Sequence, residues 1–503
     1  MKKILILGGG SAGWMAATAL NKTLSAENFE ITLVESAAIG TIGVGEGSTP
    51  HLQKFFNMLD VPESVWMPRC NATYKNGISF VNWTSHLPEN RYFHPFPSII
   101  DRQTAVAFLT NCMQRHIGKD LPVNPDDFFL AKKLSADGLG PKTLKGKPNI
   151  PINYAYHFDS VKLGLFLAEL GKKRGIKHIE GKFIDATTAE NGDIKSIKLD
   201  DGTELEADFF IDASGFSSQL LQQHLNVDFQ SFNSNLFNDS AIALPSKTED
   251  TILAQTTATA LSSGWAWHIP LTNRTGNGYV FSSKYLSFEE AEKELRDHLA
   301  KNNIEVAADA KARHIKMKVG QVKQAWKNNV MAIGLAQGFI EPLEATALHL
   351  VADSLQLFLK HFNRGHYKIN QVTLFNDAVY QRYEGIRDYI VCHYKVNSRH
   401  LVQSDNTYWQ DCANNKYLSD NLQAVLAAWE GKKDITPTIQ SRDMGNYYPV
   451  VSWYCLLAGY GYYNHTPIVE PMSTRNQADY EKLKTFISKM ASQFKTHQDL
   501  LIT

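Results

Sequence analysis

The sequence predicts an α/β fold, and three short strands carry this prediction. Each is an apolar run that leads into a turn of small residues: ILIL at 4–7, FFIDASG at 209–215 and VMAIG at 330–334. Continuous apolar runs of this length are typical of strands buried on both faces of a parallel sheet. We therefore expect the three strands to lie in one sheet, with their turns at the same edge.

A glycine-rich motif follows the first of these strands. Residues 8–13 read GGGSAG, and residues 14–20 have a helical pattern. In such a unit the first glycine permits a tight turn, the second lets the backbone approach a pyrophosphate, and the third lets helix and strand pack closely. The helix N-terminus adds N–H groups that suit an anion. The motif predicts a Rossmann-like nucleotide-binding site whose cofactor contacts include Gly8, Gly10, Ser11, Ala12 and Gly13.

Two further features support a nucleotide at this edge. A second strand, residues 30–34, ends at Glu35, near the spacing at which an acidic residue meets a ribose. The turn after the third apolar strand adds Gly334 and Leu335 to the expected contacts. Together, strand, helix and acid favour dinucleotide binding over a purely structural glycine turn. No second Gly-x-Gly-x-x-Gly follows a strand, so we expect no separate nicotinamide domain.

The chain becomes rich in aromatic residues and helical pattern from about residue 375. We therefore divide it into a nucleotide-binding region with inserted β-sheet elements, residues 1–375, and a mostly helical region packed on it, residues 376–503. Proline, glycine and polar residues cluster at 436–445, which predicts a long loop.

Bulk composition excludes several classes of function. The 503 residues contain 51 basic and 51 acidic side chains, so charge favours neither nucleic acid nor an anionic membrane as a partner. The five cysteines are widely spaced, with no zinc-like pattern, and no apolar run is long enough to span a bilayer. We expect a soluble, cytoplasmic protein with reduced thiols, no metal site and small-molecule partners.

The segment SGWAWHIPL, residues 263–271, places two tryptophans two positions apart. In an extended strand Trp265 and Trp267 share one face while Ala266 and His268 share the other. Pro270 disfavours helix at Ile269 and keeps the segment extended. The pattern alone allows a tryptophan face that is simply core.

With these motifs in view, the chain resembles the flavin-dependent halogenases, in particular the tryptophan-halogenase-like group. The resemblance rests on the glycine motif and on the Trp-x-Trp-x-Ile-Pro segment at 265–270. Shorter matches run in the same order along nearly the whole chain, at residues 41–50, 74–75, 94–96, 155–159, 338–344, 387–388 and 393–394.

The resemblance implies a fold, a cofactor and a reaction. The expected fold is α/β, with a Rossmann-like FAD-binding domain of the flavin monooxygenase type and a mostly helical C-terminal region that covers the substrate. Members bind FAD, receive it reduced from a separate flavin reductase, and convert oxygen and halide into hypohalous acid. The acid then passes through an internal tunnel to an aromatic substrate. The resemblance implies that the tunnel is lined by Trp265, Trp267, Ile269 and Pro270, where the tryptophans keep the substrate from the flavin.

Two residues are expected to carry the second half of the chemistry. Lys75 matches the family's essential lysine, which positions the hypohalous acid; its pKa should fall in an apolar passage. Glu344 matches the family's catalytic glutamate, which stabilises the cationic ring intermediate and helps to remove its proton. The ordinary alternatives are a surface lysine and a solvated acidic loop, and Glu341 is the competing acid.

Halide and substrate contacts follow from the same resemblance. The halide is expected at the backbone N–H groups of Thr346 and Ala347, in a segment that reads EATA where the family has ESTG. Because of this change, bromide is as plausible as chloride. The substrate contacts implied by the family are His94, Phe96, Tyr447 and Tyr448.

Tyr454 stands where tryptophan halogenases place the glutamate that binds the substrate ammonium. We therefore expect free tryptophan to be a poor substrate and an uncharged indole or another electron-rich aromatic to be preferred. A single-component flavin hydroxylase and a flavin-binding protein without catalysis are the rival hypotheses. A homodimer is compatible with the sequence, which does not identify the reductase.

Overall fold

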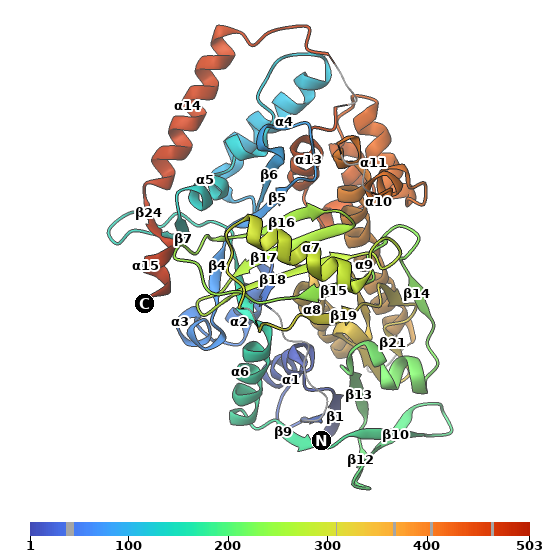
Figure 1. The fold of residues 1–503 in the computed structure, drawn as a ribbon. Helices are drawn as coiled ribbons and strands as arrows, with labels where there is room; N and C mark the ends of the chain where they lie inside the picture. Colours follow the sequence, from blue (N-terminus) through green and yellow to red (C-terminus); the bar gives the residue numbers. More distant parts are fainter. Residues whose placement is uncertain (37–44, 308, 366–368, 403–405, 464–466, 503) are drawn as a thin grey trace. The chain divides into compact units, whose positions relative to one another are not determined.

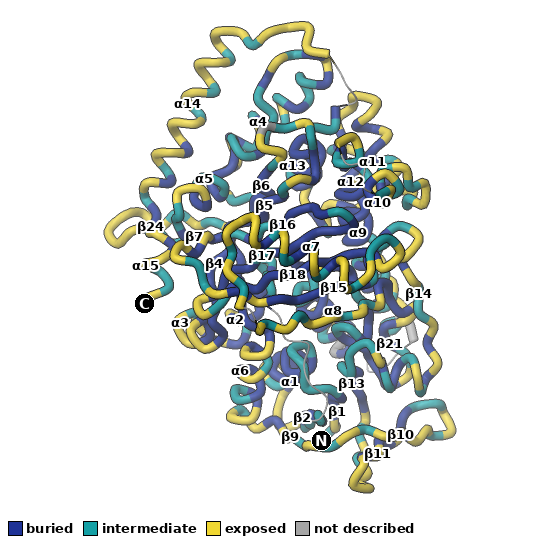
Figure 2. Tube along the Cα trace, in the orientation of Figure 1, coloured by how far each residue is buried: buried dark blue, intermediate teal, exposed yellow. Residues whose placement is uncertain are grey.

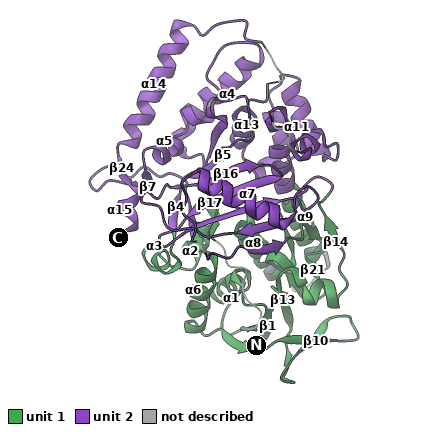
Figure 3. Cartoon of the chain, viewed as in Figure 1, with its two compact units in different colours: residues 1–72, 158–233, 317–384 green, residues 73–157, 234–316, 385–503 purple. Residues whose placement is uncertain are grey.

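The computed structural model describes residues 1–36, 45–307, 309–365, 369–402, 406–463 and 467–502. The chain forms two compact units, each assembled from three separate segments (Figure 3). Unit 1 contains residues 1–72, 158–233 and 317–384, and unit 2 contains residues 73–157, 234–316 and 385–503. The units interleave along the chain, whereas the regions 1–375 and 376–503 follow one another in sequence. That sequential division stays a prediction.

Unit 1 is built on a six-stranded sheet with the strand order β21-β22-β13-β1-β2-β9. Figure 1 labels its strands β21, β13, β1 and β9. Every neighbouring pair is parallel except β21 and β22. The three predicted apolar strands are its adjacent members β22, β13 and β1, so the expectation of one shared sheet is confirmed. The strands of this sheet are β1 (Lys2–Leu7), β2 (Phe29–Glu35), β9 (Lys177–Glu180), β13 (Phe209–Asp212), β21 (Trp326–Lys327) and β22 (Val330–Ala332).

The register of this sheet brings the small-residue turns to one edge. Leu7 pairs with Asp212, and Asp212 pairs with Ala332, so the three strands end at the same level. The carboxyl edge of a parallel sheet is where α/β proteins bind ligands, at the crevice that the turns line.

The other elements of unit 1 are mostly helical. α1 packs against α6 and α8, and α2 also packs against α8. The helices are α1 (Ser11–Thr23), α2 (His51–Met58), α3 (Glu63–Trp66), α6 (Ser160–Lys173) and α8 (Ala347–Gly365); α9 (Ile369–Lys395) begins in unit 1 and continues into unit 2. The smaller strands are β3 (Gly45–Gly47), β10 (Phe183–Thr188), β11 (Ile194–Leu199), β12 (Glu204–Glu206), β14 (Phe229–Ser231), β20 (Gly320–Val322) and β23 (Gly338–Phe339).

Unit 2 contains a seven-stranded sheet with the order β19-β15-β18-β17-β16-β5-β6. Its pairs are antiparallel except β16 with β5. The strands are β5 (Gly77–Val81), β6 (Arg91–Pro95), β15 (Ser240–Ala243), β16 (Gln255–Leu261), β17 (Gly264–Pro270), β18 (Thr275–Phe281) and β19 (Arg313–Lys316). Two smaller sheets contribute β4 (Thr73–Lys75), β7 (Leu139–Thr143), β8 (Ala155–Asp159) and β24 (Phe494–Thr496).

One face of this sheet packs against helix α7 (Phe288–Lys301). Ala266 of β17 joins a core formed by neighbouring strands and by the apolar side of α7, with members that include Tyr279, Phe281, Leu295 and Leu299. Residues of β17 that alternate with Ala266 therefore occupy the opposite face. Both tryptophans are buried there, so the sheet is covered on both sides at β17, as its dark blue colour in Figure 2 shows.

The region after residue 376 is mostly helical, as the sequence predicts. The helices of unit 2 are α4 (Arg102–His116), α5 (Leu130–Ala136), α7, the end of α9, α10 (Tyr408–Asn414), α11 (Asp420–Glu430), α12 (Thr436–Ser441), α13 (Val450–Gly459), α14 (Thr474–Ala491) and α15 (His497–Leu501). Most of α14 is exposed (yellow in Figure 2), apart from the residues near its end that pack with Leu130 and Leu134 of α5.

The predicted long loop at 436–445 is wrong. Residues 436–441 form α12, and a short 3₁₀ turn follows at Met444–Asn446. Pro437 lies in the first turn of α12, where a proline costs no hydrogen bond because the N–H groups of that turn have no partner within the helix. Within the described part of the chain, none of the helices has both the length and the apolar character needed to cross a membrane.

Candidate active site

The glycine turn after β1 has the geometry that a nucleotide-binding turn requires. Gly8 has φ +117°, and a Cβ on it would lie 2.2 Å from the carbonyl oxygen of Ala213. A Cβ on Gly13 would lie 1.9 Å from the carbonyl oxygen of Gly8, so the start of α1 packs directly on the turn. Both positions require glycine, for the turn and for close packing respectively.

Gly10 differs from these two glycines. Its φ of −70° suits any residue, and a Cβ there would meet no heavy atom within 4 Å. The space beside Gly10 is open, while the backbone around it is fixed by α1, which begins at Ser11. This is the arrangement expected where a pyrophosphate contacts the backbone at a helix N-terminus, so the turn fits a dinucleotide.

Glu35 ends β2 and lies against the same turn. A Cβ on Gly9 would collide with the Glu35 carboxylate, whose Oε1 lies 2.8 Å from Nε2 of His178. The imidazole holds the carboxylate at the carboxyl edge of the sheet. The structure thus brings the predicted ribose ligand beside the glycine motif.

The other two small-residue turns complete this edge. Gly334 has φ +62°, and a Cβ on it would lie 2.7 Å from Cβ of Ala12, so the turn carrying Gly334 and Leu335 lies against α1. The turn after β13 is held by Asp212, whose buried carboxylate accepts hydrogen bonds from the hydroxyl of Ser214 and from backbone N–H groups, including those of Leu220 and Leu221.

Glu46, on β3, is a titratable group of unit 1 that the sequence reasoning did not single out. Burial raises its pKa to about 7, a hydrogen bond from Ser160 acts against this shift, and the charge of Asp159 adds to it. The carbonyl of Ser160 in turn accepts a hydrogen bond from the Ser11 hydroxyl at the start of α1. Residues 41–44 of the same sequence match lie outside the described residues.

The acidic segment after β23 is buried. Glu341 precedes the 3₁₀ turn Pro342–Glu344, which Glu344 ends, and the two acids are 0% and 4% exposed. The alternative of a solvated acidic loop is therefore wrong. Ala345 follows in the left-handed region at φ 56°, a backbone strain of the kind found at functional sites.

The expected halide ligands lie at the start of α8. Thr346 is buried and its carbonyl oxygen accepts from the N–H of Leu350, which closes the first turn of the helix. Ala347 is the first residue of α8. N–H groups in a first helical turn have no partner within the helix and carry the positive end of its dipole. The segment can therefore bind a small anion.

Lys75 lies on β4 and its side chain is 0% exposed, so the alternative of a surface lysine is wrong. Its Nζ lies 5.7 Å from the ring centroid of Phe96. The pKa of His157 is held well below its usual range by burial and by the nearby positive charge of Lys75. An aromatic ring and a neutral imidazole thus lie near the lysine.

β4 is tied to the end of the tryptophan strand. The hydroxyl of Thr73 donates to the carbonyl oxygen of Pro270 at 2.8 Å. Ile269, the preceding residue, is buried. Within unit 2 the lysine strand and the Trp-x-Trp-x-Ile-Pro strand are therefore neighbours.

Trp265 and Trp267 lie on one face of β17, with ring centroids 6.3 Å apart. Small residues oppose Trp267 on both neighbouring strands, where it pairs with Ala258 and Gly278. A Cβ on Gly278 would lie 2.0 Å from the Trp267 ring, so the ring fills the space that the glycine leaves. The buried Nε1 of Trp267 has no hydrogen-bond partner among the described residues.

Two of the four predicted substrate residues, His94 and Tyr448, contact the same ring of unit 2, that of Tyr389. Tyr448 stacks on Tyr389 at 3.6 Å between ring centroids, and His94 meets Tyr389 edge to face at 6.0 Å. Tyr447 lies against Gly385, where a Cβ would collide with its ring. Phe96 is the neighbour of Lys75 described above.

Tyr454 is buried and turned toward a different set of residues. Its hydroxyl donates to Oδ1 of Asp434 at 2.8 Å, and its ring meets Trp429 edge to face. Burial, followed by the hydrogen bond to Asp434, raises the pKa of this phenol above its usual range. The residue is thus neutral and already paired with a carboxylate.

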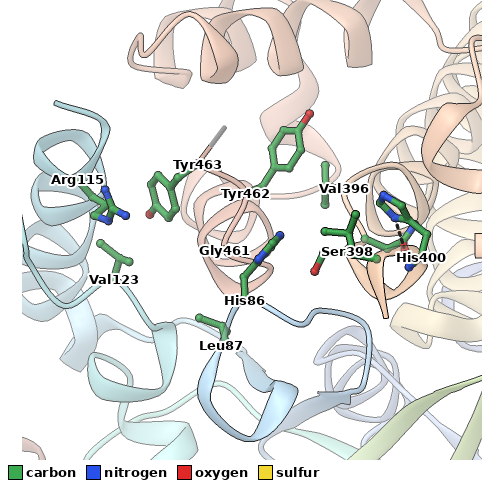
Figure 4. Close-up of a pocket in the computed structure, with 12 residues that line it drawn as sticks. His86, Leu87, Arg115, Val123, Val396, Ser398, His400, Gly461, Tyr462 and Tyr463 are labelled. Atoms are coloured by element: carbon green, nitrogen blue, oxygen red, sulfur yellow. Dashed lines mark hydrogen bonds between the residues drawn. The ribbon is translucent and has the colours of Figure 1, made fainter. Parts of the chain in front are cut away.

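Unit 2 also has an open pocket of about 430 Å³ (Figure 4). It is lined by segments near His86, Arg115, His400 and Tyr462, and the Arg115 guanidinium lies 5.5 Å from the Tyr463 ring centroid. None of the site residues predicted from sequence lines this pocket.

Taken together, these features define a class. A parallel sheet with a dinucleotide-binding turn, a fully buried lysine beside aromatic rings and a paired-tryptophan strand are the parts of a nucleotide-cofactor enzyme that acts on an aromatic substrate. The tryptophan halogenase profile matches residues 3–474, and the chain belongs to the tryptophan halogenase family of flavin-dependent enzymes.

The similarity to known members extends over nearly the whole length. The chain is 35% identical to 7-chloro-L-tryptophan 6-halogenase KtzR of Kutzneria sp. (strain 744), over 98% of this chain and 96% of that protein. It is 35% identical to tryptophan 6-halogenase SttH of Streptomyces toxytricini, over 89% and 86%. The solved structure of SttH matches with a TM-score of 0.84, covering 99% of each chain, and that of the flavin-dependent halogenase BrvH from Brevundimonas sp. BAL3 matches with 0.82 at 27% identity, covering 100% and 99%. The predicted fold and family are confirmed.

Proposed function

We propose that this chain is a two-component flavin halogenase that uses reduced FAD, oxygen and bromide or chloride to halogenate an indole-like or other electron-rich aromatic. The observation that carries the proposal is the complete burial of Lys75 on β4. A buried ammonium is costly unless its surroundings compensate for the lost water, so a lysine in this position indicates a chemical role.

The cofactor is assigned to unit 1. The turn around Gly10 binds the pyrophosphate of FAD, Glu35 binds the ribose, and the turn of Gly334 and Leu335 borders the same site. When bound and reduced, FAD supplies the oxygen chemistry that converts halide to hypohalous acid. The N–H groups of Thr346 and Ala347 hold the halide. The burial of both acids in the preceding segment supports a water-poor site there.

Lys75 and Glu344 divide the halogen transfer between them. The lysine amine hydrogen-bonds the hypohalous acid, X–OH, and positions its halogen toward the aromatic ring. A ring carbon forms the C–X bond as the X–O bond breaks. Glu344 stabilises the cationic ring and takes its proton, and the hydroxide and that proton leave as water. Glu341 is the structural acid in this assignment.

The tryptophan strand separates the two chemistries. Trp265 and Trp267, with Ile269 and Pro270, line the passage of the hypohalous acid and exclude water and substrate from the flavin. The unpaired Nε1 of Trp267 offers a hydrogen-bond donor along such a route. Core packing is the competing role, and both roles are compatible with the observed burial.

Substrate choice rests on Tyr454. His94, Phe96, Tyr447 and Tyr448 supply aromatic contacts for a flat ring. Tyr454 carries a phenol in place of a carboxylate, and its hydroxyl is bound to Asp434, so it offers no counter-charge for an ammonium. The names of the relatives favour tryptophan, whereas Tyr454 favours an uncharged indole. Bromination rates of indole and L-tryptophan, measured side by side, decide between them, and equal rates would exclude our preference.

The reaction class is tested by mass spectrometry. Indoles and phenols are incubated with the protein, a flavin reductase, FAD, NADH and either bromide or chloride. We expect halide-dependent product, with the isotope doublet of bromine when bromide is used. Hydroxylated product with NADPH alone would instead support a single-component hydroxylase.

Lys75→Met tests the assigned lysine with little change in volume. We expect product formation to fall at least 1,000-fold while FAD binding and consumption of reduced flavin persist. Lys293→Met is the matched control, because Lys293 is exposed on α7 and should leave turnover unchanged. Substantial product from Lys75→Met would remove the lysine from the mechanism.

A further inference from the structure

Two histidines and an aspartate of unit 1 lie together outside the proposed cofactor and halide contacts. They are His51 at the start of α2, and His349 and Asp353 on α8. One ligand atom from each lies within 4.8 Å of the other two, and the structure describes no other such group. The positions 349 and 353 are one helical turn apart, so both side chains project from one face of α8.

The group is built as a site rather than as a surface cluster. The side chains of His349 and Asp353 are 9% and 10% exposed. Nε2 of His349 is buried and has no hydrogen-bond partner among the described residues, although it lies 3.1 Å from Oδ2 of Asp353. A metal ion between this nitrogen and the carboxylate oxygen would use both as ligands.

The surrounding contacts orient the three side chains. The Arg382 guanidinium lies 3.2 Å from Oδ2 of Asp353 and fixes the carboxylate, which has lone pairs for a second partner. Oγ1 of Thr49 lies 3.4 Å from Nδ1 of His51, which leaves Nε2 of that ring as the ligand atom. A hydrogen bond to the nitrogen that does not bind metal is typical of metal-binding histidines.

We propose that His51, His349 and Asp353 form a binding site for a divalent transition metal of the zinc type, which clasps α2 to α8. Two imidazole nitrogens and one carboxylate oxygen are a donor set that Zn²⁺ uses. In a tetrahedral zinc site, ligand atoms about 2 Å from the metal are about 3.3 Å apart, and the His349–Asp353 distance already meets this value.

Closing the site requires a small movement of one ring. The rings of His51 and His349 are stacked at 3.6 Å with an interplanar angle of 13°, so the two ring planes are nearly parallel. Rotation of the His51 ring aims its nitrogen at the position between His349 and Asp353. His51 and His349 are both half-buried and Asp353 is buried.

Co²⁺ is the probe for this site because it replaces Zn²⁺ and absorbs visible light when bound by nitrogen and oxygen ligands. Tag-free protein is titrated with Co²⁺ and then with Zn²⁺. We expect one Co²⁺ per chain, a visible absorption band that Zn²⁺ removes, and a melting temperature that rises with Zn²⁺ concentration. Absence of a band at millimolar Co²⁺ would overturn the proposal.

Three variants locate the site. His51→Asn and His349→Phe should each weaken Co²⁺ binding at least 100-fold, while His314→Asn, which changes an exposed histidine of unit 2, should not alter it. His51→Asn is included because residue 51 lies at the start of α2, where the substitution should not disturb folding even if His349→Phe within α8 does. An unchanged band in either ligand variant, or a thiolate charge-transfer band in the near ultraviolet, would place the metal elsewhere and refute the site.

Discussion

Gly10→Ala tests the cofactor assignment without disturbing the fold. The structure has no heavy atom within 4 Å of the added Cβ, and φ at Gly10 is −70°, which alanine adopts freely. The substitution should leave stability unchanged or raise it by about 0.4–1 kcal/mol, because alanine has less freedom in the unfolded chain. The methyl group would, however, occupy the space assigned to the pyrophosphate.

Gly13→Ala is the contrasting variant. Its Cβ would lie 1.9 Å from the carbonyl oxygen of Gly8, so the helix and the turn must move apart by more than about 1 Å to reach an ordinary contact. Overpacking of this kind costs about 1–3 kcal/mol. We expect a lower melting temperature for Gly13→Ala even when no flavin is present.

The two variants are compared by thermal melting without flavin and by titration with FAD. Gly10→Ala should melt at or above the wild-type temperature yet bind FAD at least tenfold more weakly, a loss of about 1.4 kcal/mol or more. Wild-type affinity in Gly10→Ala would refute the placement of the pyrophosphate. A fall in its melting temperature equal to that of Gly13→Ala would refute the reading of the turn geometry.

Three further predictions concern other parts of the two units. The pKa of Glu46 is about 7 in the folded protein against about 4.5 in the unfolded chain, so the free energy of unfolding should fall by up to about 3 kcal/mol as pH rises from 4.5 through 7. Melting temperatures of Glu46→Gln measured across this range should lack that decrease. A constant difference between variant and wild type at every pH would contradict the prediction. Gly278→Ala should displace the Trp267 ring, at an overpacking cost of about 1–3 kcal/mol in stability that lowers the melting temperature. The tryptophan fluorescence should change as well. An unchanged spectrum would show that the ring does not fill that space. Asp212→Asn should cost about 2–4 kcal/mol in urea unfolding because an amide cannot accept all of the hydrogen bonds that the carboxylate accepts, and a cost below about 0.5 kcal/mol would argue against its role.

The parts of the fold that follow from local pattern were predictable from sequence. The apolar strands, the glycine turn and Glu35 are encoded in short stretches, and parallel pairing then brings their ends to one edge. Alternation along an extended strand placed both tryptophans on one face. The α12 helix was missed because the cluster of proline, glycine and polar residues at 436–445 was taken as a loop signal, although the first helical turn accommodates proline.

Features that depend on distant segments were not predictable from spacing. His51 and His349 lie far apart in the sequence, and no motif connects them. The burial of Lys75 could be expected only through resemblance, since lysine is ordinarily exposed. Glu46 gave no signal of its own, because its raised pKa arises from burial near Ser160 and Asp159.

The interleaving of the two units has a consequence for biosynthesis. β1 and β13 are synthesised before their partner strand β22 at Val330–Ala332, so an early β1–β13 pair would have β13 as an open edge until β22 is translated. An apolar open edge invites pairing with other nascent chains. We expect fragments that stop between residues 233 and 317 to aggregate, and no single cleavage point to yield either unit as one continuous polypeptide.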